Sequence, residues 1–220
     1  MPHEIKVSTL DDDGGRLYAR SVFSFEPGVT VLVGCNGSGK TTLMRRIESR
    51  YGWGRERGVA ARMFRCRDTD DEMSRLIGFA PTDDSFALGA SMMSSSEGER
   101  MAQALKSAFD WMWNECRNDG VTEIFMLLDS LDSGLDVHTL RMIRDVLDDV
   151  VDIARKDFGK TLYVLVAAND YALVEGRECL DVNAARRVAF KGWDDYAAFC
   201  ERSHEKKERR YEREAAKERD

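Results

Sequence analysis

One short segment, Gly34-Cys-Asn-Gly-Ser-Gly-Lys-Thr41, constrains the fold more than any other part of the sequence. It follows a continuous apolar run, Val29–Val33, and it precedes a segment with a helical pattern from about Lys40 to Arg50. Glycines at these spacings let backbone N–H groups turn toward one point, and the start of a helix adds partial positive charge there. The pattern GxxxxGK[ST] between a strand and a helix therefore predicts a phosphate-binding loop.

The ligand expected at this loop is a nucleoside triphosphate with its magnesium ion. Lys40 is placed to neutralise β- and γ-phosphate oxygens, and the Thr41 hydroxyl is placed to bind Mg²⁺. A second apolar strand, Phe125–Leu128, ends at Asp129, whose carboxylate is the second expected metal-binding group. The residues expected to contact the nucleotide here are Asn36, Gly37, Ser38, Gly39, Lys40, Thr41 and Thr42.

Strand-like and helix-like segments alternate along the rest of the chain. The uniformly apolar runs Ile124–Leu128 and Leu162–Ala168 are typical of parallel strands buried on both faces. Apolar residues at helical spacing follow Glu97 and recur between Leu140 and Ala154. Shorter β-like stretches open the chain. The alternation predicts a layered α/β fold.

Composition limits the class of protein. The chain has 220 residues, of which 43% are hydrophobic, enough for one domain with a buried core. We expect a cytoplasmic protein, because no apolar stretch reaches the ~20 residues of a membrane span and no secretory leader is visible. The net charge of −7 argues against general coating of nucleic acid or anionic membrane, although it permits a local basic groove. The five cysteines include no CxxC pair, which argues against a disulfide scaffold or a zinc site.

The order of motifs after the phosphate loop resembles the ATP-binding-cassette (ABC) class of ATPases. Ser133-Gly-Leu-Asp136 matches the loop that follows the acidic strand in that class, and Ser95-Ser-Glu-Gly-Glu99 resembles its signature segment. By itself the second segment also fits a helix-capping sequence. The resemblance implies an ABC-type P-loop nucleotide-binding domain with N-terminal antiparallel strands and a small helical subdomain. It also implies ATP and Mg²⁺ as cofactors and an ATP-dependent homodimer, in which each nucleotide meets Ser96, Gly98, Glu99 and Asp136 of the other copy.

Within this class the pattern is similar to the RecF, SMC and repair-type cassettes and to small stand-alone ATP-binding proteins of phage and bacterial genomes. Glu99 and the long helix after it carry that similarity. It implies DNA or a DNA-processing protein as partner, and Arg55–Arg67 is either a DNA-phosphate contact or an Arg-rich surface loop. The segment between Lys40 and Ser96 is too short for a long coiled-coil arm. A transporter ATPase subunit is a weaker alternative.

Three positions depart from the ABC pattern, and they are the candidate catalytic residues. Ser130 occupies the position of the catalytic Glu and cannot act as a general base at neutral pH. Asn169 occupies the position of the switch His, and the usual Gln has no counterpart. Asp132 is either a substitute base or a turn-capping acid. We therefore expect slow ATP hydrolysis, with a catalytically weak switch or regulatory subunit as the alternative.

The expected domain boundaries are residues 1–200 for the ATP-binding domain and 201–220 for a charged tail, with a helical subdomain at about 65–118. The tail mixes eight Lys/Arg with seven Asp/Glu, which predicts a charge-laced helix or a disordered segment. A solvated appendage is favoured over a docking element for a partner. Tyr18 is either an adenine-stacking aromatic or an ordinary strand residue.

Overall fold

The computed structural model describes residues 2–11, 14–52, 56–65, 96–132 and 135–217. Its centre is a sheet with strand order β4-β5-β6-β3-β7-β8. The first five strands in this order run parallel, and β8 pairs antiparallel with β7. Their bounds are β3 Gly28–Val33, β4 Gly58–Arg65, β5 Val121–Asp129, β6 Thr161–Ala167, β7 Glu178–Asp181 and β8 Arg186–Ala189.

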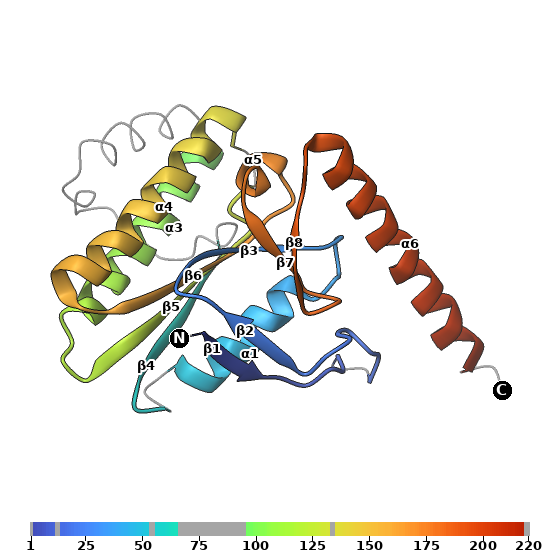
Figure 1. Ribbon diagram of the computed structural model, residues 1–220, viewed down its shortest axis with the longest axis horizontal. Helices are drawn as coiled ribbons and strands as arrows, with labels where there is room; N and C mark the ends of the chain where they lie inside the picture. Colours follow the sequence, from blue (N-terminus) through green and yellow to red (C-terminus); the bar gives the residue numbers. More distant parts are fainter. Residues whose placement is uncertain (1, 12–13, 53–55, 66–95, 133–134, 218–220) are drawn as a thin grey trace.

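Helices cover both faces of this sheet (Figure 1). On one face lie α3 (Ser96–Cys116), α4 (Val137–Phe158) and the short α5 (Tyr171–Val174). On the other lie α1 (Lys40–Tyr51) and a separate antiparallel pair, β1 (His3–Lys6) with β2 (Val22–Phe25). The predicted α/β fold class is confirmed, and the described chain has a mainly parallel sheet with helices on both faces.

Successive residues of the central strands belong to two different cores. Met126 and Leu128 pack against α3 and α4, whereas Phe125 and Leu127 pack on the side of α1. All four side chains are completely buried. Because side chains alternate across a strand, burial on both faces requires an unbroken apolar run, and this explains the composition of β5 and β6.

An aromatic cluster fills the core on the α1 side. The Phe125 ring stacks on Tyr163 with centroids 4.4 Å apart and on Tyr51 at 5.7 Å. The ring of His3 meets Phe125 edge-on, and its imidazole contacts Glu123 and the Tyr51 hydroxyl. These contacts fix the N-terminal strand pair against the sheet.

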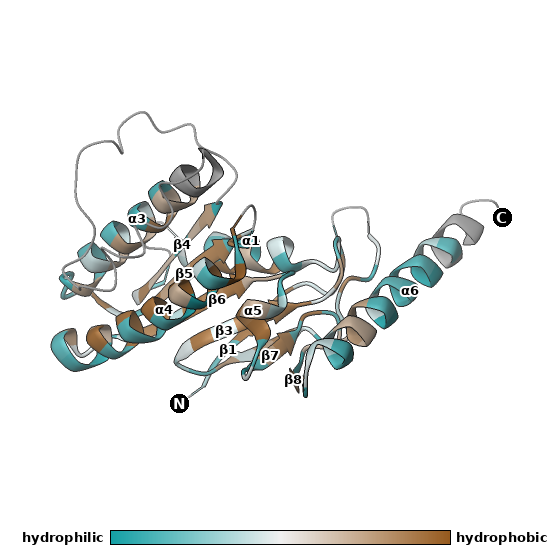
Figure 2. Cartoon of the chain, turned by 90° about the horizontal axis from the view of Figure 1, so that it is seen from above, coloured by the Kyte–Doolittle hydropathy of each residue, from teal (hydrophilic) through white to brown (hydrophobic). Residues whose placement is uncertain are grey.

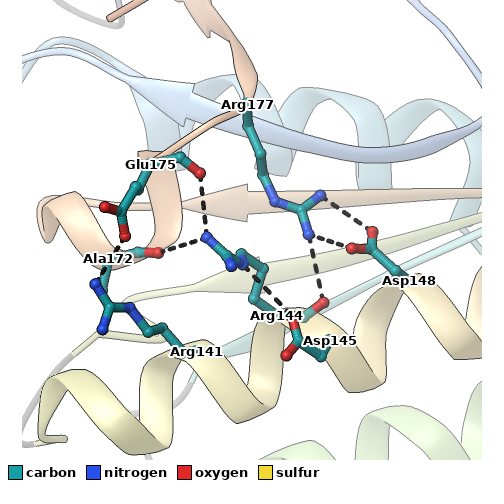
Figure 3. Close-up of polar contacts among 7 residues, drawn as sticks. All are labelled: Arg141, Arg144, Asp145, Asp148, Ala172, Glu175 and Arg177. Carbon is teal, nitrogen blue, oxygen red and sulfur yellow. Dashed lines mark hydrogen bonds and ion pairs between the residues drawn. The ribbon is translucent and has the colours of Figure 1, made fainter. Parts of the chain in front are cut away.

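A group of arginines joins α4 to the segment that connects α5 to β7 (Figure 3). The guanidinium of Arg177 binds both carboxylate oxygens of Asp148 and lies 3.5 Å from the carbonyl oxygen of Arg144. Arg144 in turn donates to the carbonyl oxygen of Glu175 at 3.1 Å, and Arg141 pairs with the Glu175 carboxylate at 2.8 Å. This network fixes α5, which begins directly after the loop that contains Asn169.

The last described helix, α6, runs from Trp193 to Lys217 and crosses the expected boundary at residue 200 without a break. Its first turns pack on the core through Tyr196 and Phe199, whose rings contact Phe190 at 5.2 and 5.1 Å. Beyond them the helix is hydrophilic (Figure 2). The charged segment is therefore helical up to Lys217. Most of the expected helical subdomain, residues 66–95, lies outside the described residues.

Candidate nucleotide-binding site

The loop between β3 and α1 has the backbone shape that its glycines predict. Gly34, Gly37 and Gly39 all have positive φ, at 147°, 77° and 96°. A Cβ at Gly34 would lie 2.6 Å from the Ser38 hydroxyl, and one at Gly39 would lie 2.9 Å from the Tyr18 ring. Larger residues therefore do not fit at Gly34 and Gly39 without a shift. The N-cap of α1 is Gly39, which makes no side-chain cap hydrogen bond, and helix N-termini of this kind favour anions.

Lys40 folds back over this loop. Its ammonium group donates to the carbonyl oxygen of Gly34 at 2.6 Å and to the side-chain oxygen of Asn169 at 3.1 Å. The residue is only 8% exposed, and this burial lowers the pKa of the amine from its ordinary value. The lysine is thus held at the loop by neutral oxygen atoms, which an anionic phosphate oxygen would replace with a stronger partner.

Thr41 and Asp129 meet although they come from different parts of the chain. The Thr41 hydroxyl lies 3.1 Å from each carboxylate oxygen of Asp129, the last residue of β5. Asp129 is 8% exposed. A hydroxyl and a carboxylate are both oxygen donors of the kind that Mg²⁺ prefers, so this pair fits the expected metal.

The three candidate catalytic residues lie at the ends of β5 and β6. One carboxylate oxygen of Asp132 accepts hydrogen bonds from the backbone N–H groups of Asn169 and Asp170 and so ties the two loops together. Ser130 adopts a left-handed backbone conformation with φ of 62°. The Tyr196 hydroxyl of α6 donates to the carbonyl oxygen of Asn169 at 2.9 Å.

The residues expected to face a second copy are only partly described. Ser96, Gly98 and Glu99 form the first turn of α3, and their side chains lie outside the described residues, as do Ser133 and Gly134. Asp136 is the N-cap of α4, where its carboxylate accepts from the backbone N–H of Thr139 at 3.0 Å and from the Thr139 hydroxyl at 2.9 Å. These hydrogen bonds lower the pKa of Asp136.

One cavity of about 460 Å³ gathers most of the described candidate residues. A cavity of this size is in the range of small-molecule sites. Besides the loop it includes two α6 residues, Arg210 and Tyr211, which were expected to belong to a charged tail. The lining residues are Asp11, Leu17, Asn36, Gly37, Ser38, Gly39, Lys40, Thr41, Thr42, Asp129, Ser130, Ala167, Asn169, Arg210 and Tyr211.

Tyr18 lies beneath the phosphate loop. Its side chain is fully buried, its hydroxyl donates to the carbonyl oxygen of Gly39 at 2.8 Å, and burial raises its pKa to about 12. Tyr18 is not an ordinary strand residue either, because β2 begins only at Val22; its ring is packed under the loop and presents no face to a nucleotide base.

The fold and this site define the chain as an α/β protein with a P-loop between strand and helix. No protein-family model and no curated protein sequence matches it. Among solved structures, it is similar to a metal-chelate type ABC transporter in an inward-facing conformation (15% identity, TM-score 0.48, covering 90% of this chain and 88% of the other). It is also similar to a dimeric ATP-binding cassette in a post-hydrolysis state bound to ADP and Pi (12%, 0.42, 87% and 97%). A third similar structure is a nucleotide-free ATP-binding cassette from an ABC transporter (13%, 0.45, 90% and 95%).

Proposed function

We propose that this protein binds Mg·ATP at residues 36–42 and hydrolyses it slowly. The observation that carries this proposal is the meeting of Lys40, Thr41 and Asp129 around one cavity at the start of α1. Loop amides and Lys40 would hold the phosphates, while Thr41 and Asp129 would hold the metal ion that neutralises charge on the triphosphate. Asn169, at the Lys40 ammonium, would contact the terminal phosphate.

Calorimetric titration with ATP tests this function directly. Wild-type protein is expected to bind ATP more tightly with Mg²⁺ than with EDTA. Lys40→Ala is expected to lose most of the affinity, because it removes the buried cation at the loop. Lys160→Ala is the matched control, since Lys160 binds the carbonyl oxygens of Asn118 and Val121, outside the cavity. Equal ATP binding by both variants would contradict the proposal.

The low hydrolysis rate rests on Ser130 and Asp132. A serine hydroxyl is not a base at neutral pH, and the carboxylate of Asp132 already accepts two backbone N–H groups. The same two residues favour a second candidate function, an ATP-dependent switch that works by binding without turnover. Phosphate release by wild-type protein at a rate ordinary for cassette ATPases, and abolished in Lys40→Ala, would exclude the switch.

We further propose that ATP assembles a homodimer with the ABC arrangement, in which Ser96, Gly98, Glu99 and Asp136 of one copy close on the nucleotide of the other. Such an interface uses the same surface of both copies. Mass measured in solution with ATP and Mg²⁺, against nucleotide-free protein, is the test. A monomer in both conditions would contradict this arrangement.

DNA or a DNA-processing protein is the partner we propose, on the similarity of the signature segment to RecF, SMC and repair-type cassettes. Gel shift of duplex DNA at low salt, with and without ATP, is the measurement, because phosphate contacts are strongest at low salt. If DNA is not shifted in either condition, DNA is not the partner.

No helix in the described ranges is long and apolar enough to cross a bilayer.

A further inference from the structure

One face of α6 contacts the loops around the nucleotide cavity. The contacts come from Tyr196, Ser203, Lys207 and Arg210, which recur at helical spacing and so form a single docking face. Ser203 accepts a hydrogen bond from the backbone N–H of Cys35 at 3.1 Å. Lys207 donates to the carbonyl oxygen of Asn36 at 2.8 Å. The segment expected to be a solvated tail therefore lies against the phosphate loop.

Of the two cations of this docking face, Lys207 lies at the phosphate loop and Arg210 lies in the wall of the nucleotide cavity. The ammonium group of Lys207 is so close to Gly37 that a Cβ there would lie 2.9 Å from it. Arg210 lines the nucleotide cavity and donates to the carbonyl oxygen of Arg16 at 2.8 Å. The acidic residues Glu205 and Glu208, by contrast, are exposed and pair with Arg209 and His204 on other faces of α6.

A second cavity, of about 320 Å³, extends this basic surface between α6 and the turn that joins β7 to β8. It shares Leu17, Gly37, Ser38 and Arg210 with the nucleotide cavity. Among its described lining residues Asp181 is the only acidic one, and its carboxylate accepts from the backbone N–H groups of Asn183 and Ala184. The basic lining residues are Arg16, Arg186, Arg202, Lys206, Lys207 and Arg210. In a protein of net charge −7, this concentration of cations beside the loop attracts anions locally.

We propose that Lys207 and Arg210 bind the polyphosphate of the nucleotide, so that α6 completes the phosphate site of its own chain. This assignment rests on the proposed nucleotide function and adds two binding residues to it. A glycine loop gives backbone N–H groups and Lys40, and α6 adds the positive charge of Lys207 beside Asn36 and Gly37 and that of Arg210 in the wall of the cavity. The contribution of these charges grows with the number of phosphates on the ligand.

The experiment compares ATP and ADP affinities of Arg210→Ala and Lys207→Ala with those of wild-type protein. Arg209→Ala is the matched control, because Arg209 is adjacent on the helix, carries the same charge and pairs with Glu205 at 3.7 Å on the exposed side. We expect Arg210→Ala and Lys207→Ala each to lose about tenfold or more in ATP affinity, which is the effect of one charge-assisted hydrogen bond. The loss of ADP affinity is expected to be smaller. Arg209→Ala is expected to stay within about twofold of wild type.

Ser203→Ala separates charge from simple attachment of the helix. It removes the hydrogen bond to Cys35 but no charge, so an ATP loss as large as that of Arg210→Ala would overturn the proposal in favour of a structural role. Equal affinities in Arg210→Ala, Lys207→Ala and Arg209→Ala would also overturn it, while leaving nucleotide binding intact. Failure of wild-type protein to bind ATP would instead refute the proposed function itself.

Discussion

The ammonium group of Lys40 lies 3.1 Å from the side-chain oxygen of Asn169, although the two residues are 129 positions apart in the chain. The contact exists because β3 and β6 are neighbours in the sheet, so the segments after their carboxyl ends meet at one edge. Asn169 accepts this hydrogen bond without contributing charge. The hydrogen-bond partners of the Lys40 ammonium in the described structure are therefore neutral oxygen atoms.

The first prediction concerns pH. Burial lowers the pKa of Lys40 in the unliganded protein, and a bound phosphate raises it again because it stabilises the ammonium form. Nucleotide binding then takes up protons, so the affinity for ATP is expected to fall as the pH rises through the lowered pKa of Lys40. The measurement is ATP affinity from about pH 8 upward, where phosphate groups are already ionised.

Lys40→Arg is the control for this pH dependence, because a guanidinium stays protonated throughout. Its ATP affinity, whatever its absolute value, is expected to change less over the same pH range than that of wild-type protein. If the ATP affinities of wild-type protein and Lys40→Arg change with pH to the same extent, a group other than Lys40 titrates.

The second prediction concerns the metal ion. Asp129→Asn removes the negative charge that faces the Thr41 hydroxyl, while keeping the shape of the side chain. We expect ATP to bind this variant with nearly the same affinity in Mg²⁺ and in EDTA, whereas wild-type protein distinguishes the two conditions. A Mg²⁺ dependence unchanged from wild type would place the metal on other groups.

The third prediction separates the two roles of Asp132. Its carboxylate oxygen accepts the N–H groups of Asn169 and Asp170, and an amide oxygen in Asp132→Asn preserves that acceptor. We expect Asp132→Asn to keep most of the stability, and Asp132→Ala to lose about 1 kcal/mol through the loss of two hydrogen bonds at a partly exposed loop. Urea unfolding gives the stabilities. A stable Asp132→Asn variant without phosphate release, where wild-type protein releases it, would identify Asp132 as the base.

The fourth prediction concerns Ser130, which directly follows β5 and its last residue, Asp129. Ser130→Glu introduces a carboxylate where the ABC pattern has its catalytic base, and we expect it to raise the rate of phosphate release. Ser130→Gln, of nearly equal size but uncharged, is expected to leave the rate unchanged. If Ser130→Glu is also without effect, the attacking water is activated elsewhere in the site.

The fifth prediction tests the arginine network of Figure 3. Arg177 has an 18% exposed side chain and binds both oxygens of Asp148, so we expect Arg177→Ala to lower the free energy of unfolding by about 1–3 kcal/mol. Arg141→Ala removes a 51% exposed partner of Glu175 and is expected to cost under about 1 kcal/mol. If urea unfolding shows equal losses of unfolding free energy in the two variants, burial of the arginine has little influence on the stability that its ion pair contributes.

The central strands β3, β5 and β6 were predictable because their chemistry is local, whereas β4 (Gly58–Arg65) lies in the segment that was expected to be an Arg-rich surface loop or a DNA contact. Burial on both faces demands unbroken apolar runs, and Ile124–Leu128 and Leu162–Ala168 show them plainly. The phosphate loop was predictable for a similar reason, since positive φ at Gly34, Gly37 and Gly39 leaves a fixed residue pattern. The contacts of Lys40, Thr41, Asp129 and Asn169 then follow from which strands are neighbours.

The position of α6 was not predictable in the same way. Its docking face consists of charged and hydroxyl side chains, which have no apolar periodicity to mark them as packed. Ser203 and Lys207 find their partners at Cys35 and Asn36, 168 and 171 residues earlier, and nothing in the local sequence encodes such a pairing. The spacing of Ser203, Lys207 and Arg210 indicates that they share one face of the helix, but it does not indicate which part of the fold this face contacts. Tyr18 was ambiguous because a buried aromatic and a base-stacking one look alike in sequence.

The distance along the chain between the phosphate loop and α6 has a consequence for the order of events during synthesis. The loop is translated 171 residues before Lys207, the residue that contacts Asn36. Until α6 has emerged, the sheet and the loop can form while Cys35 and Asn36 still lack their helical partners. A growing chain thus carries this cavity without its α6 wall, and the wall is complete only after Arg210 and Tyr211 have been made.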